Sequence, residues 1–206
     1  MKFCGCICAE DALLAVDCGA DAVGMIFADS PRRIAFRDAE RIVAALPPSV
    51  VPVGVFVDPS LAEIRRARAI FPHLAIQLHG GESSGFVAEV GGTTIKALHV
   101  DPAHADEAAL ERAADSYADA LLLFDSKIEG LAGGSGVAFS WHAIAAIARR
   151  RRVIVAGGLT PENVGACVRV VRPYGVDVRG GVETGGRKDE AKMRSFVRSV
   201  READAT

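Results

Sequence analysis

The chain has 206 residues, of which 50% are hydrophobic, and its 24 Lys and Arg against 26 Asp and Glu give a formal net charge of −2. This balance argues against nucleic acid and anionic membranes as partners, because surfaces that bind them usually carry a basic excess. No apolar run approaches the ~20 residues of a membrane-spanning helix, so no membrane partner is expected. The length predicts a single domain over residues 1–206 with a large core.

The N-terminal residues and the cysteines indicate a reducing compartment. Residues 1–8 lead directly into charged Glu10, so we expect no signal peptide. Five cysteines, three of them crowded at positions 4, 6 and 8, make a poor disulfide framework. We therefore expect a cytoplasmic location.

Short apolar segments of β type alternate eight times with helical segments. The predicted strands cover residues 2–6, 22–27, 50–57, 74–78, 94–98, 120–124, 153–156 and 175–178. The predicted helices cover residues 10–18, 37–46, 60–70, 83–90, 106–114, 140–150, 161–171 and 189–201. This alternation predicts an α/β chain with a parallel sheet, and eight units favour closure into a (β/α)8 barrel; an open doubly wound sheet is the alternative. In a barrel, chemistry takes place where the strands end and their following loops begin.

The first predicted strand ends among cysteines. Cys4 and Cys6 are alternate residues, so both could point into the barrel. A thiolate can act as a general base where positive charge lowers its pKa, and Lys2 lies on the same strand face as Cys4. Zinc needs about four ligands and no second Cys pair follows, so we expect no metal site. Burial as a small hydrophobe is the alternative for the other cysteines.

Polar side chains follow later strands. Arg32, in the turn after the second strand, suits bidentate binding of a carboxylate, although surface arginines are usually only solvated. The fourth strand finishes at His79. Asp125 ends the apolar sixth strand, where a carboxylate is costly to bury unless it is paired or used; the alternative is a turn or N-cap residue. Residues 126–137 are rich in glycine and predict a mobile loop able to fold over a ligand.

Two glycine pairs follow the last two strands. Gly157 and Gly158 precede a helix predicted to open at residues 160–161, and Gly180 and Gly181 follow the eighth strand. Glycines let backbone amides approach an anion, and a helix N-terminus favours one. Either pair alone could be a tight turn. Together they predict the phosphate site that barrels form between the loops after strands seven and eight.

These residues resemble the phosphoribosylanthranilate isomerases, barrel enzymes of tryptophan biosynthesis, over nearly the whole chain. The matching motifs include Lys2-Phe3-Cys4-Gly5, Ser30-Pro31-Arg32, Gln77-Leu78-His79-Gly80, Ile95-Lys96-Ala97, Gly133-Gly134-Ser135-Gly136, Ala156-Gly157-Gly158-Leu159 and Arg172-Pro173-Tyr174-Gly175-Val176-Asp177-Val178. So many matches in order make the resemblance specific.

The resemblance implies an Amadori rearrangement of N-(5-phosphoribosyl)anthranilate to 1-(2-carboxyphenylamino)-1-deoxyribulose 5-phosphate, without metal or organic cofactor. The expected partner is this small phosphosugar, and the expected assembly is a monomer or homodimer. By resemblance Cys4 is the general base and Asp125 the general acid, so their pKa values should be pushed in opposite directions. The residues expected to bind substrate are Arg32 at the anthranilate carboxylate, Asp177 at its amine, His79, and the phosphate-binding Gly157, Gly158, Gly180 and Gly181.

The chain departs from the family after the eighth strand. Relatives usually have Val-Ser-Ser-Gly-Val-Glu, whereas this chain has Arg179-Gly180-Gly181 between its valines. Period-two alternation places Arg179 on the same face as Asp177, toward the site. We hypothesise that Arg179 either contacts the phosphate directly or forms an ion pair with Asp177.

Other readings of the sequence stay open. One is a related aminoaldose-phosphate isomerase with shifted or relaxed specificity, for which Arg179 is the only hint. A catalytically silent phosphosugar-binding barrel is disfavoured because Cys4 and Asp125 are both present. A thiol-based metal or redox module would use the cysteines at positions 4, 6 and 8. The histidines at positions 73, 99, 104 and 142 lack metal-like spacing and receive no role, and the basic run at 149–152 fits the end of a helix.

Overall fold

The computed structural model describes residues 1–101, 106–126 and 140–205. Its barrel strands are β1 (Lys2–Cys4), β2 (Ala22–Ile26), β3 (Val51–Phe56), β4 (Ala75–Leu78), β5 (Thr94–Val100), β6 (Leu121–Ser126), β7 (Val153–Val155) and β8 (Gly175–Val178). Its α-helices are α1 (Ala9–Cys18), α2 (Phe36–Ala45), α3 (Leu61–Ile70), α4 (Ser84–Val90), α5 (Glu107–Ser116), α6 (His142–Arg150), α7 (Val164–Val171) and α8 (Glu190–Asp204).

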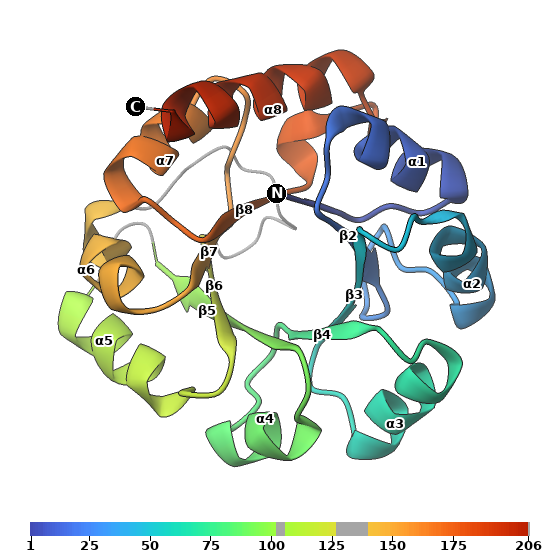
Figure 1. Ribbon diagram of the computed structural model, residues 1–206. Helices are drawn as coiled ribbons and strands as arrows, with labels where there is room; N and C mark the ends of the chain where they lie inside the picture. Colours follow the sequence, from blue (N-terminus) through green and yellow to red (C-terminus); the bar gives the residue numbers. More distant parts are fainter. Residues whose placement is uncertain (102–105, 127–139, 206) are drawn as a thin grey trace.

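The eight strands close into a parallel barrel, with the helices in a ring around it (Figure 1). Closure is made by β1, which pairs with β2 on one side and with β8 on the other. In these two ladders Lys2 lies beside Ala22 and beside Asp177. The predicted (β/α)8 barrel is confirmed, and the open doubly wound sheet is excluded.

The helix starts follow from capping residues in the sequence. Ser60 and Glu63 form a reciprocal capping box at the start of α3, and Ser83, Asp106 and Asp189 accept hydrogen bonds from backbone amides at the starts of α4, α5 and α8. Such side chains satisfy amides that a helix leaves without partners at its N-terminus. The predicted helices therefore lie within a few residues of the observed ones.

Two local predictions were wrong, and one further element was not predicted. The first strand ends at Cys4 rather than residue 6, because Gly5 has a φ of +73° and turns the chain. The seventh helix begins at Val164 rather than residue 161. After β8 the chain forms a short 3-10 helix, η1 (Gly180–Val182), and an antiparallel hairpin of β9 (Glu183–Thr184) and β10 (Arg187–Lys188) that was not expected.

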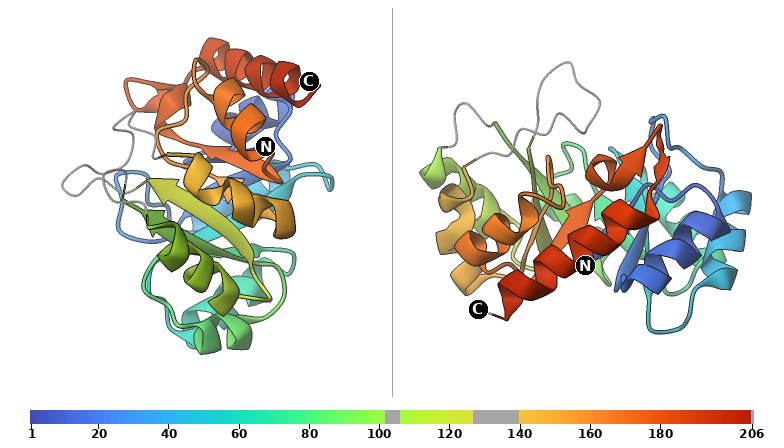
Figure 2. Two further views of the ribbon diagram at one scale, coloured as in Figure 1. Left: turned by 90° about the vertical axis from the view of Figure 1, so that its left-hand side faces the viewer. Right: turned by 90° about the horizontal axis from the view of Figure 1, so that it is seen from above.

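The core has two layers. The outer layer, between strands and helices, contains large side chains such as Phe3, Phe124 and Phe196. Smaller residues such as Val53 and Ala75 fill the inside of the barrel. Both termini lie at the same end of the barrel (Figure 2), and the strands finish at the other end, where a barrel site is expected.

Two surface findings bear on partners. In the basic run 149–152, Arg150 forms ion pairs with Glu111 and Asp115 of α5, and Arg151 donates to the carbonyl of Ala114. These arginines therefore join α6 to α5 instead of forming a free basic surface. Among the described residues, no helix has the length and apolar character needed to cross a bilayer.

Candidate active site

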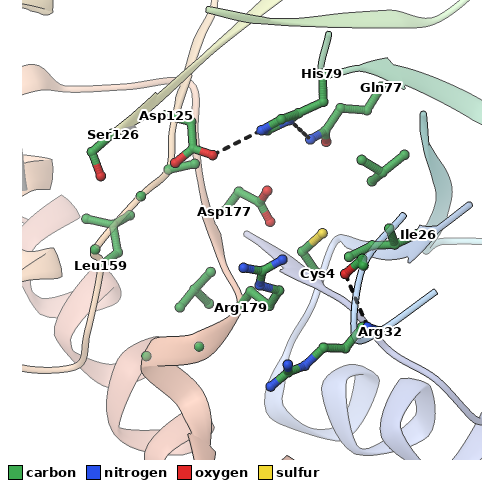
Figure 3. Close-up of a pocket in the computed structure, with 18 of the residues that line it drawn as sticks. Cys4, Ile26, Arg32, Gln77, His79, Asp125, Ser126, Leu159, Asp177 and Arg179 are labelled. Carbon is green, nitrogen blue, oxygen red and sulfur yellow. Dashed lines mark hydrogen bonds and ion pairs between the residues drawn. The ribbon is translucent and has the colours of Figure 1, made fainter. Parts of the chain in front are cut away.

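A cavity of about 680 Å³ opens where the barrel strands end (Figure 3). Its size falls in the usual range for small-molecule sites, about 300–1,000 Å³. Period-two alternation explains its lining, because the last inward-facing residue of each strand, or for β7 the residue directly after the strand, contributes to it. These residues are Cys4, Ile26, Val55, Gln77, His99, Asp125, Ala156 and Asp177.

Cys4 faces this cavity, but Cys6 does not. Cys4 packs inside the barrel with Ile26 and Val55, whereas Cys6 is fully buried in the outer layer, where burial raises the pKa of its thiol to about 12. The possibility that both cysteines point inward is excluded, because the turn at Gly5 interrupts the alternation, and the alternative of Cys6 as a buried small hydrophobe is confirmed. Among the described residues, no cysteine belongs to a group able to hold a metal, which removes the structural basis for the thiol-based metal module.

Charged side chains surround Cys4. The buried Lys2 ammonium donates to Asp177 Oδ2 at 2.7 Å, and the Lys188 ammonium donates to the Cys4 carbonyl at 2.6 Å. Burial raises the pKa of the Cys4 thiol above its ordinary value, and Lys2 offsets this only in part. Lys2 lowers this pKa as expected, but burial outweighs it, so the expectation of a thiol pKa below its ordinary value was wrong.

Asp125 lies near the end of β6 and takes part in a chain of hydrogen bonds. Its Oδ2 is 3.1 Å from His79 Nε2, and Gln77 Nε2 is 3.1 Å from His79 Nδ1. A Gln77 amide that donates to Nδ1 leaves Nε2 to carry the proton of a neutral ring, directed at Asp125. Asp125 is therefore a paired strand residue, and the N-cap alternative is excluded.

The two glycine turns pack against their neighbours more tightly than any other residue would allow. A Cβ on Gly157 would lie 2.4 Å from Asp125 Oδ1, and a Cβ on Gly181 would lie 1.9 Å from the Leu159 carbonyl oxygen. Gly157 and Gly158 also have φ of +78° and +63°, which favour glycine. These glycines therefore let the turns pack against β6 and against each other. This packing requires glycine whether or not a ligand binds there.

Arg32 lines the cavity, but its guanidinium is engaged elsewhere. Its Nη2 forms an ion pair with Glu183 of the hairpin, to which Lys188 also donates at 3.0 Å. Burial opposes ionisation of Glu183, but Lys188 and Arg32 outweigh it and hold the pKa of this carboxyl below its usual value. The Nε atom of Arg32 is buried and lacks a hydrogen-bond partner.

Arg179 projects into the same space as Cys4 and Asp177 (Figure 3). Its aliphatic stem lies against Gly5, where an added Cβ would be 3.2 Å from Arg179 Cδ and 3.5 Å from Arg32 Cγ. The structure has no ion pair between Arg179 and Asp177; Asp177 Oδ2 pairs with Lys2 instead. That version of the hypothesis was wrong, and Asp177 Oδ1 stays buried without a partner.

The sequence analysis missed four residues of this region. Glu183 and Lys188 lie on the unexpected hairpin, and Gln77 received no role. His99 lies in register beside Asp125 on the neighbouring strand, and the inward alternation of Ile95, Ala97 and His99 could have shown it. The expected glycine-rich loop falls almost wholly on residues 127–139, outside the described residues.

Comparison with known proteins decides the family. The family model for N-(5'phosphoribosyl)anthranilate (PRA) isomerase matches residues 1–199. The chain belongs to this family. It is 46% identical to the N-(5'-phosphoribosyl)anthranilate isomerase of Desulforudis audaxviator over 98% of both chains, and 45% identical to that of Pseudomonas fluorescens over 97% of this chain and 94% of the relative.

Solved structures of the phosphoribosylanthranilate isomerase family agree. The Thermotoga maritima enzyme superimposes with a TM-score of 0.88 at 37% identity, covering 98% of both chains. A phosphoribosyl anthranilate isomerase in complex with reduced 1-(o-carboxyphenylamino)-1-deoxyribulose 5-phosphate superimposes with a TM-score of 0.85 at 36% identity, covering 98% of this chain and 97% of that one. The family assignment made from sequence motifs is confirmed.

Proposed function

We propose that this chain isomerises N-(5-phosphoribosyl)anthranilate to 1-(2-carboxyphenylamino)-1-deoxyribulose 5-phosphate, with Cys4 as general base and Asp125 as general acid. One observation carries the assignment of roles. In a chain of this family, a thiol from β1 and a carboxyl from β6 reach one small-molecule cavity from different sides (Figure 3). No metal or organic cofactor takes part in the proposed reaction.

The reaction needs two proton transfers. Protonated Asp125 donates to the ring oxygen of the ribose, so that the C1–O bond breaks and the anthranilate nitrogen becomes an iminium. The Cys4 thiolate then removes the C2 proton, and the electron pair moves toward the iminium to form an enolamine. Loss of the enol proton with protonation at C1 gives the ketone. Because the iminium is positive, it favours the thiolate at the moment when Cys4 must act.

Other residues have binding roles in this proposal. Asp177 would accept a hydrogen bond from the anthranilate amine, and its unpartnered Oδ1 in the cavity lining supports this role. Arg32 would bind the anthranilate carboxylate after exchanging its contact with Glu183, and its unpartnered Nε supports this role. Gly157 and Gly158 line the cavity, and within the described chain their amide nitrogens have no backbone acceptor, which supports a role in binding phosphate.

The assembly and location remain proposals. We propose a monomer or homodimer, because a related Thermotoga maritima structure concerns monomers generated from a dimeric enzyme. A cytoplasmic location stays a prediction from the cysteine content.

Two substitutions test the catalytic roles. General acid and base groups each contribute about 10²–10⁴ in rate, so Cys4→Ser and Asp125→Asn should each lower kcat by that factor. The measurement is the loss of the anthranilate adduct's fluorescence. Cys8→Ser is the matched control: Cys8 lies outside the cavity at the N-cap of α1, a position where serine is favoured. Wild-type turnover in Cys4→Ser or Asp125→Asn would contradict the assignment.

A further inference from the structure

His79, His99 and Asp125 form a group that the proposed reaction uses only in part. They come from three consecutive strand ends around the barrel, and each offers one ligand atom, all within 4.8 Å of one another. His79 and His99 face each other edge to face, with ring centroids 5.0 Å apart. His79 Nε2 already lies 3.1 Å from Asp125 Oδ2. All three side chains line the cavity.

Two imidazoles and one carboxylate are ligands that first-row transition metals accept. In tetrahedral zinc sites with bonds of about 2.0–2.1 Å, neighbouring ligand atoms lie about 3.3 Å apart. Here one separation is 3.1 Å and none exceeds 4.8 Å, so modest side-chain rotations would close the group around one ion. A fourth position would stay open to the cavity and to water.

Gln77 supplies an independent observation. It is 1% exposed, it contacts His79 Nδ1 through its Nε2, and its Oε1 is buried without a partner. If a metal bound His79 Nε2, the ring proton would have to sit on Nδ1, and Nδ1 would then need an acceptor. A half-turn of the Gln77 amide presents that acceptor. Histidines bound to metals usually donate their other N–H to such a group.

We propose that these three side chains form a divalent transition-metal site of the zinc type, and that metal bound there inhibits the enzyme. Binding displaces the proton shared between His79 and Asp125 and occupies the carboxylate. The ion would therefore remove the general acid and exclude substrate from this side of the cavity. Metal binding itself does not depend on the proposed function, whereas inhibition rests on the role of Asp125.

Cobalt is the probe for binding, because its visible absorption reports a tetrahedral site. Wild-type protein titrated with Co²⁺ should gain this absorption, and Zn²⁺ should displace it. Loss of a hydrogen-bond partner of a metal ligand lowers metal affinity about 10–100-fold, and loss of the ligand itself should cost at least as much. His99→Asn should therefore weaken Zn²⁺ binding by about 100-fold or more. His73→Asn is the matched control, an exposed histidine outside the group.

Inhibition is measured separately, as the rate with Zn²⁺ relative to each variant's own metal-free rate in phosphate-free buffer. Wild type and His73→Asn should be inhibited and recover with chelator, while His99→Asn should resist. Absence of cobalt absorption, thiolate charge-transfer bands that place the metal on cysteines, or equal zinc affinity of wild type and His99→Asn would overturn the site. Binding at the three residues without inhibition would overturn the inhibitory part and count against Asp125 as the acid.

Discussion

At the scale of single residues, Cys4 lies in an environment that disfavours its reactive form. Its thiol is buried, and although the Lys2 ammonium favours the thiolate, the Asp177 carboxylate opposes it. A resting thiol is less exposed to oxidation than a thiolate, since the thiolate is the reactive species. In the proposed reaction the Cys4 thiolate is favoured only when the positively charged intermediate is present, so the thiol would be protected from oxidation between turnovers.

Arg179 provides the first residue-scale prediction. Within the described chain its guanidinium has no ion-pair partner, although it lies in the cavity beside Arg32. A charged hydrogen bond to a substrate anion is worth about 1.5–3 kcal/mol, so Arg179→Ser should raise KM roughly tenfold or more with little change in kcat. Steady-state kinetics check this, with exposed Arg33→Ser as the matched control. An unchanged KM would exclude contact between Arg179 and the phosphate or carboxylate.

Residue positions in the cavity were predictable where alternation along a strand continued to its end. Cys4, Asp125 and Asp177 lie on inward positions and were placed correctly in the cavity. The inward placement of Cys6 was wrong because the sequence does not show that Gly5 takes a positive φ. The alternation along its strand marks His99 as inward-facing, but its role was missed because the residues that it meets come from other strands, and no spacing within the sequence marks that group.

At the scale of elements, a buried ion pair supports the loop that carries His79. Lys96 Nζ donates to Glu82 Oε2 and to the Gly80 carbonyl, both at 2.6 Å, and both side chains are 2% exposed. Glu82 also accepts from the Asp58 and Gly80 amides. The pair therefore holds the segment after β4 against the turn after β3.

Breaking this pair should destabilise the protein strongly. Lys96→Met leaves the Glu82 carboxylate buried without its partner and should lower the free energy of unfolding by about 3–5 kcal/mol in urea denaturation. Arg65→Met, which removes an exposed pair with Glu89 at 3.9 Å, should cost at most about 1 kcal/mol. Adding Glu82→Gln to Lys96→Met should recover part of the loss. Equal costs for Lys96→Met and Arg65→Met would contradict a supporting role.

The elements themselves were mostly predictable, and the failures have physical causes. The hairpin of β9 and β10 is too short for a periodic signal, although its turn residues Gly185 and Gly186, with φ of +57° and +78°, form the glycine pair typical of two-residue hairpins. Residues 161–163 form a turn before α7 because the Asn163 side chain bonds to Thr160 and Gly158. Such side-chain contacts compete locally with helix formation.

At the scale of the whole molecule, closure of the barrel converts eight separate strand ends into one cavity. Lys2 and Asp177 are 175 residues apart in sequence yet pair across the closing ladder between β1 and β8. The same closure buries carboxylates among ammonium and guanidinium groups. Charged pairs fixed by the fold make its stability depend on pH.

Acid should unfold the protein through Glu82 and Glu183. Burial opposes ionisation of both, but hydrogen bonds and cations hold their pKa values below the usual range in the folded state. The unfolded chain binds protons more readily at these sites, near pH 4.3 for free glutamate. Their contribution is therefore complete above that pH and is lost as pH falls through the lower folded values. Urea denaturation between pH 7 and pH 3 should show this loss.

Alkali should destabilise the protein through the cysteines, whose pKa values are raised by folding and not lowered. Burial raises the pKa of Cys6 and of Cys167 to about 12, while an unfolded thiol titrates near pH 8.5. Above that pH the unfolded chain releases protons that the folded chain keeps, so stability should fall. Cys6→Ala, which removes one such thiol, should flatten the alkaline fall and leave the acid limb unchanged. An alkaline limb identical in both proteins would show that Cys6 is not a buried neutral thiol.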